Sequence, residues 1–275
     1  MRIVLSCGVV VLFGLLAACA KPTTARVVDP ELRSDLEAVR VLRIFFGHQS
    51  VGRNILGGIE RLSRDTGIPI RITGSESAPS ADAWLAESAI GVNGDPQSKC
   101  DDFQKQVTKL GARLDVAVMK FCYADFDAAS DADSVLLQYS QTIGELQKQF
   151  PRVTFIHATA PLKIAPSGIR HWIKHTVGAA GEENQAANLK RSRFNELLRT
   201  RYLGELIFDL AGVESTGADG VRTAFTLDGQ TGFALLPAYS SDGGHLNDLG
   251  SAVAARELIR IIAVAARTHS SQMAR

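Results

Sequence analysis

Asp242 and His245 lie three residues apart, separated by two glycines, just before a long apolar-periodic segment. In such a loop the carboxylate can hold the imidazole in one tautomer, which is what an acid–base pair requires. A covalent reaction also needs a nucleophile. Ser50 is a candidate, because it follows an apolar run and opens an amphipathic segment, where helical N–H groups favour developing negative charge.

The positions of these residues depend on the elements around them. Continuous apolar runs predict buried strands, and segments with a 3.6-residue apolar period predict helices. Because strands alternate with helices, we expect a parallel sheet covered on both faces. The prediction is one three-layer α/β/α sandwich with a mainly parallel five-stranded sheet. Strands are expected at residues 41–46, 68–73, 114–119, 153–158 and 206–209, helices at 30–39, 50–64, 101–112, 133–150 (capped by Asp133), 182–202 and 247–267, a weak helix at 81–88 and a hairpin within 221–233.

Parallel α/β sheets bind ligands at the carboxyl ends of their strands. Ser50 follows the first predicted strand, while Asp242 and His245 lie between the fifth strand and the last helix, so we expect all three on one edge. Ser50 could then attack a carbonyl carbon while His245 takes its proton and Asp242 orients the imidazole. Gly52 and Gly94 allow backbone N–H groups to approach an oxyanion, where one donor typically lowers the barrier by about 3 kcal/mol.

Two stretches stand out as motifs: Gly-His-Gln-Ser-Val-Gly at residues 47–52, between a strand and a helix, and Asp-Gly-Gly-His-Leu-Asn at residues 242–247. Both resemble blocks of the SGNH (GDSL-type) hydrolase family. The resemblance covers most of the chain in element order. It implies a flavodoxin-like sandwich, serine esterase chemistry through an acyl-enzyme, Ser50, Asp242 and His245 as catalytic residues, and no metal or organic cofactor.

The middle of the chain departs from the family's pattern. Ser50 comes one residue later than the serine of the usual Gly-Asp-Ser block. The third block, normally Gly-x-Asn-Asp, is replaced by residues 120–125, which contain no Asn. The resemblance therefore leaves several candidates for the oxyanion hole: the backbone N–H of Gly91 or Gly94, the side chain of Asn93, and the positive charge of Lys120.

Each catalytic candidate also has a structural interpretation. Ser is a preferred helix N-cap residue, so Ser50 could serve as a cap. The 242–245 stretch could be a glycine turn ahead of a helix. His48 lies two residues before Ser50 and is interpreted as structural or as the wall of a pocket, although it could also compete as the base.

The segment after the third strand carries further candidates. Lys120 and Tyr123 are interpreted as pocket residues. Lys120 ends a buried strand, where a charge needs a partner, and Asp125 or Asp209 could provide it. In that case Lys120 would be structural.

The N-terminus predicts export. Arg2 precedes an apolar run over residues 3–16, which is too short for a comfortable membrane span, and Leu-Ala-Ala-Cys at 16–19 resembles the bacterial lipobox. The predicted organisation is a signal peptide at 1–18, a tether and short helix at 19–40, the hydrolase-like domain at 41–268 and a tail at 269–275. Lipidation of Cys19 would anchor the protein to a membrane on the periplasmic side. The alternative is a plain signal peptide cleaved nearby.

The remaining cysteines leave two interpretations open. An exported compartment permits a disulfide between Cys100 and Cys122, and two unpaired small hydrophobic residues are the alternative. Neither has the spacing of a metal site.

The charge composition indicates which classes of partner the protein binds. The net charge of +1 and the absence of a long Lys/Arg block argue against nucleic acid. We expect an exported serine esterase, with an ester of an envelope glycan or lipid as substrate. The alternatives are an O-acetyltransferase that uses the same acyl-enzyme and a non-catalytic envelope binding protein on the same scaffold.

Overall fold

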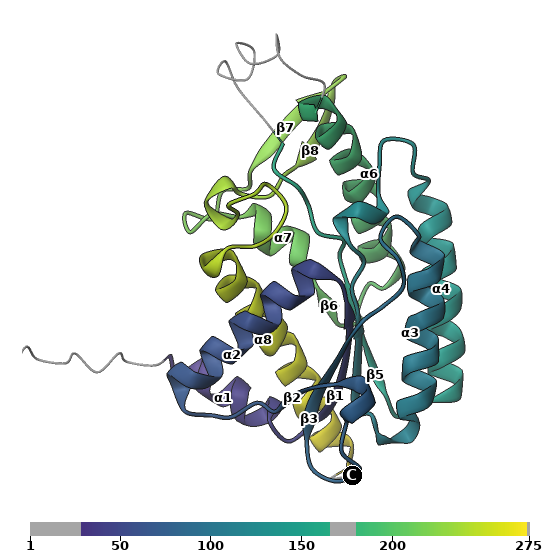
Figure 1. Cartoon of the computed structure of the whole chain (residues 1–275), viewed down its shortest axis with the longest axis vertical. Helices are drawn as coiled ribbons and strands as arrows, with labels where there is room; N and C mark the ends of the chain where they lie inside the picture. Colours follow the sequence, from purple (N-terminus) through teal and green to yellow (C-terminus); the bar gives the residue numbers. More distant parts are fainter. Residues whose placement is uncertain (1–28, 166–179, 274–275) are drawn as a thin grey trace, which may run out of the picture.

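A six-stranded parallel sheet forms the centre of the molecule in the computed structural model, which describes residues 29–165 and 180–273 (Figure 1). Every neighbouring pair of strands in it is parallel, in the order β2-β3-β1-β4-β5-β6. This confirms the predicted α/β/α class. The strands are β1 Arg43–His48, β2 Ile72–Gly74, β3 Trp84–Ala89, β4 Val116–Met119, β5 Thr154–Ala158 and β6 Ile207–Phe208.

The sixth strand, β3, is a correction, because the weak helix expected at residues 81–88 does not form. Trp84 pairs with Arg43 of β1, and Leu85 pairs with Ile72 of β2, so β3 lies between two other strands. Trp84, Leu85 and Ala86 are all buried. Burial on both faces of the sheet outweighs the local helix propensity of an Ala- and Glu-containing segment.

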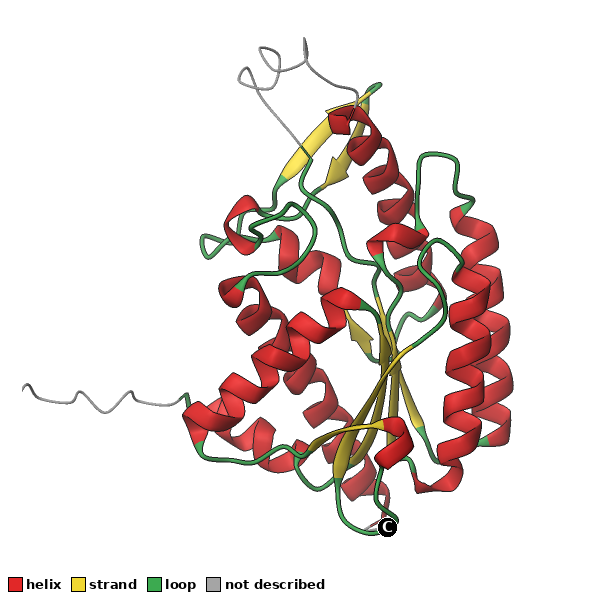
Figure 2. Cartoon of the chain, in the orientation of Figure 1, coloured by secondary structure: helices red, strands yellow, loops and turns green. Residues whose placement is uncertain are grey.

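Helices cover both faces of the sheet (Figure 2). Helices α1, α2 and α8 share one apolar cluster with the sheet, and α3, α4 and α6 share the other. The bounds are α1 Pro30–Val39, α2 Ser50–Thr66, α3 Pro96–Leu110, α4 Ala132–Gln149, α6 Ala180–Arg201, α7 Leu210–Ser215 and α8 Asp248–Met273, with short 3-10 turns η1 Ser75–Ser77, η2 Gly111–Arg113, η3 Tyr123–Asp125 and η5 Pro237–Tyr239.

Several boundaries differ from the prediction. Helix α3 begins at Pro96 rather than at residue 101, and α8 continues to Met273. Asp131, not Asp133, caps α4, because its Oδ1 accepts from the N–H of Asp133 at 3.1 Å. Helix α7 was not predicted. The hairpin within 221–233 is confirmed as β7 Ala224–Leu227 and β8 Gln230–Phe233.

Local sequence explains the helix that carries Ser50. Val51, Ile55 and Ile59 recur at helical spacing and are fully buried against the sheet and α8. Gly67 ends the helix in the left-handed region, with φ at 70°. The predicted start at Ser50 is confirmed.

Cys100 and Cys122 are both free thiols and both buried, so the disulfide alternative is wrong. The signal sequence, Cys7 and Cys19 lie outside the described residues. Within residues 29–165 and 180–273, no helix combines the length and the apolar character needed to cross a membrane.

Candidate active site

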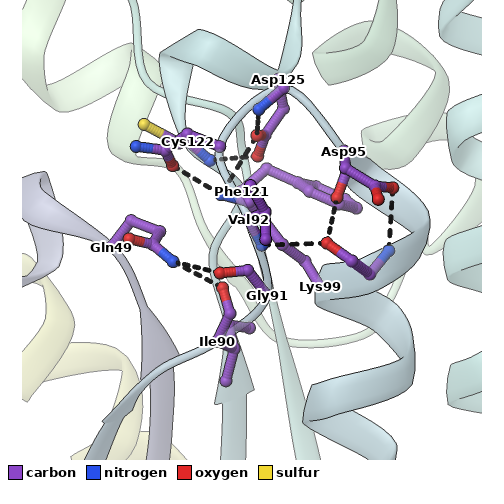
Figure 3. A network of polar contacts seen from close by, with 12 residues as sticks. Gln49, Ile90, Gly91, Val92, Asp95, Lys99, Phe121, Cys122 and Asp125 are labelled. Carbon is purple, nitrogen blue, oxygen red and sulfur yellow. Dashed lines mark hydrogen bonds and ion pairs between the residues drawn. The ribbon is translucent and has the colours of Figure 1, made fainter.

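Ser50 lies at the first turn of α2, directly after the sharp junction with β1. Gln49 at this junction is extended and makes no side-chain cap to the helix. Its Nε2 instead donates to the carbonyls of Ile90 at 2.6 Å and Gly91 at 2.9 Å, which ties the junction to the loop after β3 (Figure 3). The first N–H groups of α2 therefore remain without a side-chain cap, and the positive end of the helix dipole lies at Ser50.

The loop between η5 and α8 carries Asp242 and His245. Asp242 Oδ1 accepts from the backbone N–H of Gly244 at 3.0 Å and of His245 at 2.8 Å, while Oδ2 lies 2.6 Å from His245 Nδ1. Gly243 takes a φ of 89° to close this turn. One carboxylate thus fixes both the loop and the imidazole.

The tertiary structure brings this loop to Ser50. His245 Nε2 lies 2.9 Å from Ser50 Oγ, across 195 residues of sequence. Asn54, one turn after Ser50 on α2, accepts from the N–H of Leu246 at 3.2 Å and docks the loop on the helix. The three predicted catalytic side chains therefore form one hydrogen-bonded chain. It is open to solvent, since the His245 side chain is 39% exposed.

The charge on Asp242 is stabilised by its hydrogen bonds. The N–H of Gly244, followed by the side chain and N–H of His245, holds the pKa of this carboxyl well below its usual range. An ionised Asp242 accepts a hydrogen bond from Nδ1–H, and in that tautomer Nε2 is free to accept a hydrogen bond from the Ser50 hydroxyl. The geometry is that of a nucleophile with its base and an orienting carboxylate.

The expected glycine donors do not face an oxyanion, which is a correction. The N–H of Gly52 donates to the carbonyl of Gln49 at 2.8 Å, and that of Gly94 to Asp125 Oδ1 at 3.0 Å. The alternative, Gly91, donates to Asp102 at 3.1 Å. Gly52 is required for another reason, because a Cβ there would lie 2.7 Å from His48 Nδ1 and closer still to the base of that side chain.

The exposed Asn93 contacts a polar network that joins the loop after β3 to the turn after β4, and Figure 3 labels Lys99 and Asp125 of this network. Asn93 Oδ1 accepts from Lys99 Nζ at 2.8 Å, and Lys99 also lies 3.1 Å from Asp125 Oδ1 in an ion pair with both side chains fully buried. Asp125 Oδ2 accepts from the N–H of Cys122 at 2.7 Å. No sequence pattern marked Lys99, because it lies before the predicted start of the helix at residue 101. Whether the Asn93 amide contacts a substrate stays a prediction.

Lys120 pairs with neither predicted carboxylate. Its Nζ donates to the carbonyl of Phe121 at 2.8 Å, while Asp125 binds Lys99 and Asp209 binds Arg199. Burial lowers the pKa of Lys120 to about 8, against the opposing effect of nearby negative groups. The side chain is fully buried, so Lys120 does not line an open pocket.

Glu214 on α7 is a buried ionisable residue that sequence reasoning missed. Burial raises its pKa to about 8, although the N–H of Leu162, which donates to Oε1, opposes the shift. Its Oε2 is the one buried side-chain polar atom without a partner among the residues that the structure describes. No sequence motif marks it, because α7 itself was not expected.

His48 is structural. Its ring is buried, with Nδ1 donating to the carbonyl of Gln49 at 2.7 Å and Nε2 lying 3.0 Å from Glu87 Oε2. Both nitrogens are occupied, so His48 cannot act as the base.

Tyr123 does reach the site, since its hydroxyl lies 3.3 Å from His245 Nε2. In the described part of the chain, no group of three or more His, Cys, Asp or Glu side chains could hold a metal ion.

No protein-family model and no curated protein matches the chain. Solved structures similar to it include a lipolytic protein of the G-D-S-L family, a carbohydrate esterase and the periplasmic domain of an acetyltransferase. A protein from Desulfitobacterium hafniense, assigned to the lipolytic G-D-S-L family, shares 11% identity with a TM-score of 0.48 over 80% of this chain and 99% of its own. A family 3 carbohydrate esterase from Clostridium thermocellum shares 14% identity with a TM-score of 0.40 over 82% and 98%.

The periplasmic domain of a lipopolysaccharide acetyltransferase from Salmonella ser. Paratyphi A shares 12% identity with a TM-score of 0.43 over 80% of this chain and 84% of its own. Identities and TM-scores at this level express a likeness of fold. The function is therefore argued from the chain's own residues.

Proposed function

We propose that this chain is an exported, lipid-anchored serine hydrolase of ester bonds, of the SGNH (GDSL) type. The observation that carries the proposal is the hydrogen-bonded chain from Ser50 Oγ through His245 to Asp242, with contacts of 2.9 and 2.6 Å. A Ser hydroxyl is a weak nucleophile unless a base takes its proton, and this arrangement supplies that base.

The reaction has two halves. Ser50 Oγ attacks the carbonyl carbon of the ester as its proton passes to His245 Nε2, and the imidazolium then gives that proton to the departing alcohol. In the second half, water loses a proton to Nε2 and attacks the acyl carbon. The bond to Oγ breaks, Ser50 recovers its proton and the acid is released. Asp242 stays ionised and stabilises the imidazolium.

The developing oxyanion is expected at the start of α2. Helix α2 begins at Ser50 without a side-chain cap, so the backbone N–H of Ser50 and the helix dipole are available to negative charge there. No N–H of Gly52, Gly91 or Gly94 is needed in this scheme.

The predicted location at a membrane suggests the class of substrate. A chain lipidated at Cys19 would work at the surface of a membrane, where acyl esters of glycans and lipids are the accessible substrates. The acyl-enzyme could also be resolved by a sugar hydroxyl in place of water, which would make the protein an O-acetyltransferase.

A fluorophosphonate probe, which labels activated serines, tests the nucleophile. Wild type should be labelled, Ser50→Ala should not, and His245→Ala should react far more slowly. Ser134→Ala removes an exposed serine on α4 and is the matched control that should label like wild type. Labelling that persists in Ser50→Ala would refute the nucleophile, and a wild type that neither labels nor hydrolyses short-chain esters would favour a binding protein.

The anchor has its own test. Cys19→Ser should move the protein from the membrane fraction to the soluble fraction of cells. An unchanged partition would contradict lipidation at Cys19, without bearing on the hydrolase.

A further inference from the structure

Two hydroxyl groups lie at the same nitrogen of the proposed base. Ser50 Oγ is 2.9 Å from His245 Nε2, and Tyr123 Oη is 3.3 Å from it. Nε2 has one lone pair, and the shorter contact is the one from Ser50. The Tyr123 hydroxyl is therefore a second polar group beside the atom through which the proton passes.

A buried arginine fixes the backbone under Tyr123. Arg191 on α6 is almost fully buried, yet it donates from Nε at 3.0 Å and from Nη2 at 2.7 Å to the carbonyl of Tyr123. Nη2 also donates to the carbonyl of Phe126 at 2.9 Å. A buried cation that directs these donors at one turn leaves that turn little freedom.

The same arginine connects to the loop after β5. Arg191 Nη1 donates to Asn188 Oδ1 at 2.6 Å, and the Asn188 amide bonds both the N–H and the carbonyl of Lys163 at 3.0 and 2.7 Å. Lys163 Nζ lies 5.6 Å from the centre of the Tyr123 ring. One helix thus positions both the turn that carries Tyr123 and the cation beside its ring.

The Tyr123 ring packs against the loop that carries Asp242 and His245. A Cβ on Gly244 would lie 3.1 Å from two carbons of the Tyr123 ring, so the absence of a side chain there lets the ring approach. The ring meets His245 edge to face at 5.7 Å. Burial, with the nearby charge of Asp242, raises the pKa of Tyr123, so its hydroxyl is a proton-bearing donor at neutral pH.

The chemistry defines what else comes to Nε2. After Ser50 has attacked, the protonated nitrogen faces the oxygen of the departing alcohol, and later it faces the incoming water. In the proposed reaction the oxyanion lies on another bond of the same carbon, toward the start of α2. A hydroxyl 3.3 Å from Nε2 would then lie on the side of the leaving oxygen.

We propose that Tyr123 is a further catalytic residue, whose hydroxyl hydrogen-bonds the oxygen of the departing alcohol and then the water that replaces it; this rests on the proposed function. In the first half, the carbon–oxygen bond breaks with its electron pair going to the alcohol oxygen, which takes the proton from Nε2. Tyr123 donates a hydrogen bond to that oxygen and keeps its own proton. In the second half, the same hydroxyl holds the water that loses its proton to Nε2.

If Tyr123 has this role, the loss of kcat/KM on removing its hydroxyl should depend on which alcohol leaves. An alkyl or sugar alcohol is a poor leaving group, and stabilising its developing negative charge speeds acylation. A nitrophenolate leaves without such help. The parameter kcat/KM reports acylation, because it covers the steps up to release of the alcohol.

The test compares ethyl acetate with 4-nitrophenyl acetate in the full chain. Tyr123→Phe should lower kcat/KM for ethyl acetate about ten- to a hundred-fold, which is the usual effect of losing one hydrogen bond to a developing charge, and should change it less than threefold for 4-nitrophenyl acetate. Tyr202→Phe, on the opposite face of the sheet, is the matched control and should leave both values unchanged.

Two results would overturn the inference while leaving the proposed function intact. An equal loss with both esters would place Tyr123 in oxyanion binding or in the packing of the loop, and no loss with either ester would make its hydroxyl idle. A wild type that hydrolyses neither ester would instead refute the proposed function, and the role of Tyr123 would fall with it.

Discussion

Gly58 of α2 lies directly against the main chain of Ser251 on α8. A Cβ at residue 58 would lie 2.9 Å from the carbonyl carbon of Ser251, closer still to its oxygen, and 2.7 Å from Ala255 Cβ. Helix α2 begins with Ser50, and α8 begins three residues after His245. The close approach at Gly58 therefore sets the spacing between α2, which begins with the proposed nucleophile, and α8, which follows the proposed base.

Gly58→Ala should separate these helices and weaken the site. Overpacking of this kind typically costs about 1–3 kcal/mol of unfolding free energy, offset by up to about 1 kcal/mol from the better helix propensity of Ala. We expect a net loss in urea denaturation, together with a lower kcat/KM for 4-nitrophenyl acetate.

Gly57→Ala is the matched control on the same helix. A Cβ there meets only Arg61 Nη1, at 3.8 Å. This variant should be as stable as wild type or more so, with unchanged activity. If both variants behaved alike, the contact between Gly58 and Ser251 would not determine the helix spacing.

Asp242→Asn should retain the fold and lose most of the activity. An amide cannot accept the Nδ1 proton through its nitrogen, and the imidazole loses both its tautomer and its charge partner. The comparable substitution in a serine protease lowers kcat by about 10⁴-fold. The measurement is kcat/KM on 4-nitrophenyl acetate at pH 8, and a loss below tenfold would show that this exposed carboxylate does not orient His245.

Glu214→Gln should change how stability depends on pH. Burial raises the folded-state pKa of Glu214 from 4.5 to about 8, so between these values the folded protein holds a proton that the unfolded chain has released. The unfolding free energy of wild type should therefore fall as pH rises through this window. Gln mimics the protonated form, so the variant should gain stability relative to wild type on going from pH 5 to 8, by at most a few kcal/mol.

The opposite slope is expected above pH 8. Burial lowers the folded-state pKa of Lys120 from 10.5 to about 8, so between those values the unfolded chain holds the extra proton and stability recovers as pH rises. The control for Glu214→Gln is Glu145→Gln, the same substitution at an exposed position of α4. If the stability difference between Glu214→Gln and wild type stayed constant between pH 5 and 8, Glu214 would be ionised in the folded protein.

The two thiols should be inert in the folded protein. Cys100 and Cys122 are buried, and burial raises the pKa of Cys100 to about 12, so little reactive thiolate forms. A chain that starts at residue 20 contains only Cys100 and Cys122. A thiol reagent should react with neither cysteine under native conditions and with both in guanidinium without reductant. Finding none in guanidinium would reveal a disulfide.

Local pattern was sufficient for elements whose burial is periodic. The start of α2 at Ser50 and the bounds of α1 follow from apolar spacing and from the Asp29–Pro30 start, all of which lie within the helix itself. It failed at β3, because Trp84, Leu85 and Ala86 form a strand only when β1 and β2 lie on either side. A central strand owes its stability to partners that are distant in sequence.

The parallel sandwich and the chemical character of Ser50, Asp242 and His245 could be predicted from the sequence, since residue type, glycine spacing and position at strand ends are local properties. Which of these groups meet depends on the tertiary structure. It placed Ser50 Oγ 2.9 Å from His245, paired Asp125 with Lys99 rather than Lys120, engaged the N–H groups of Gly52 and Gly94 elsewhere, and brought Tyr123 to Nε2. Hydrogen bonds and ion pairs depend on separations of about 3 Å, and a one-dimensional pattern does not specify such distances between segments far apart in the chain.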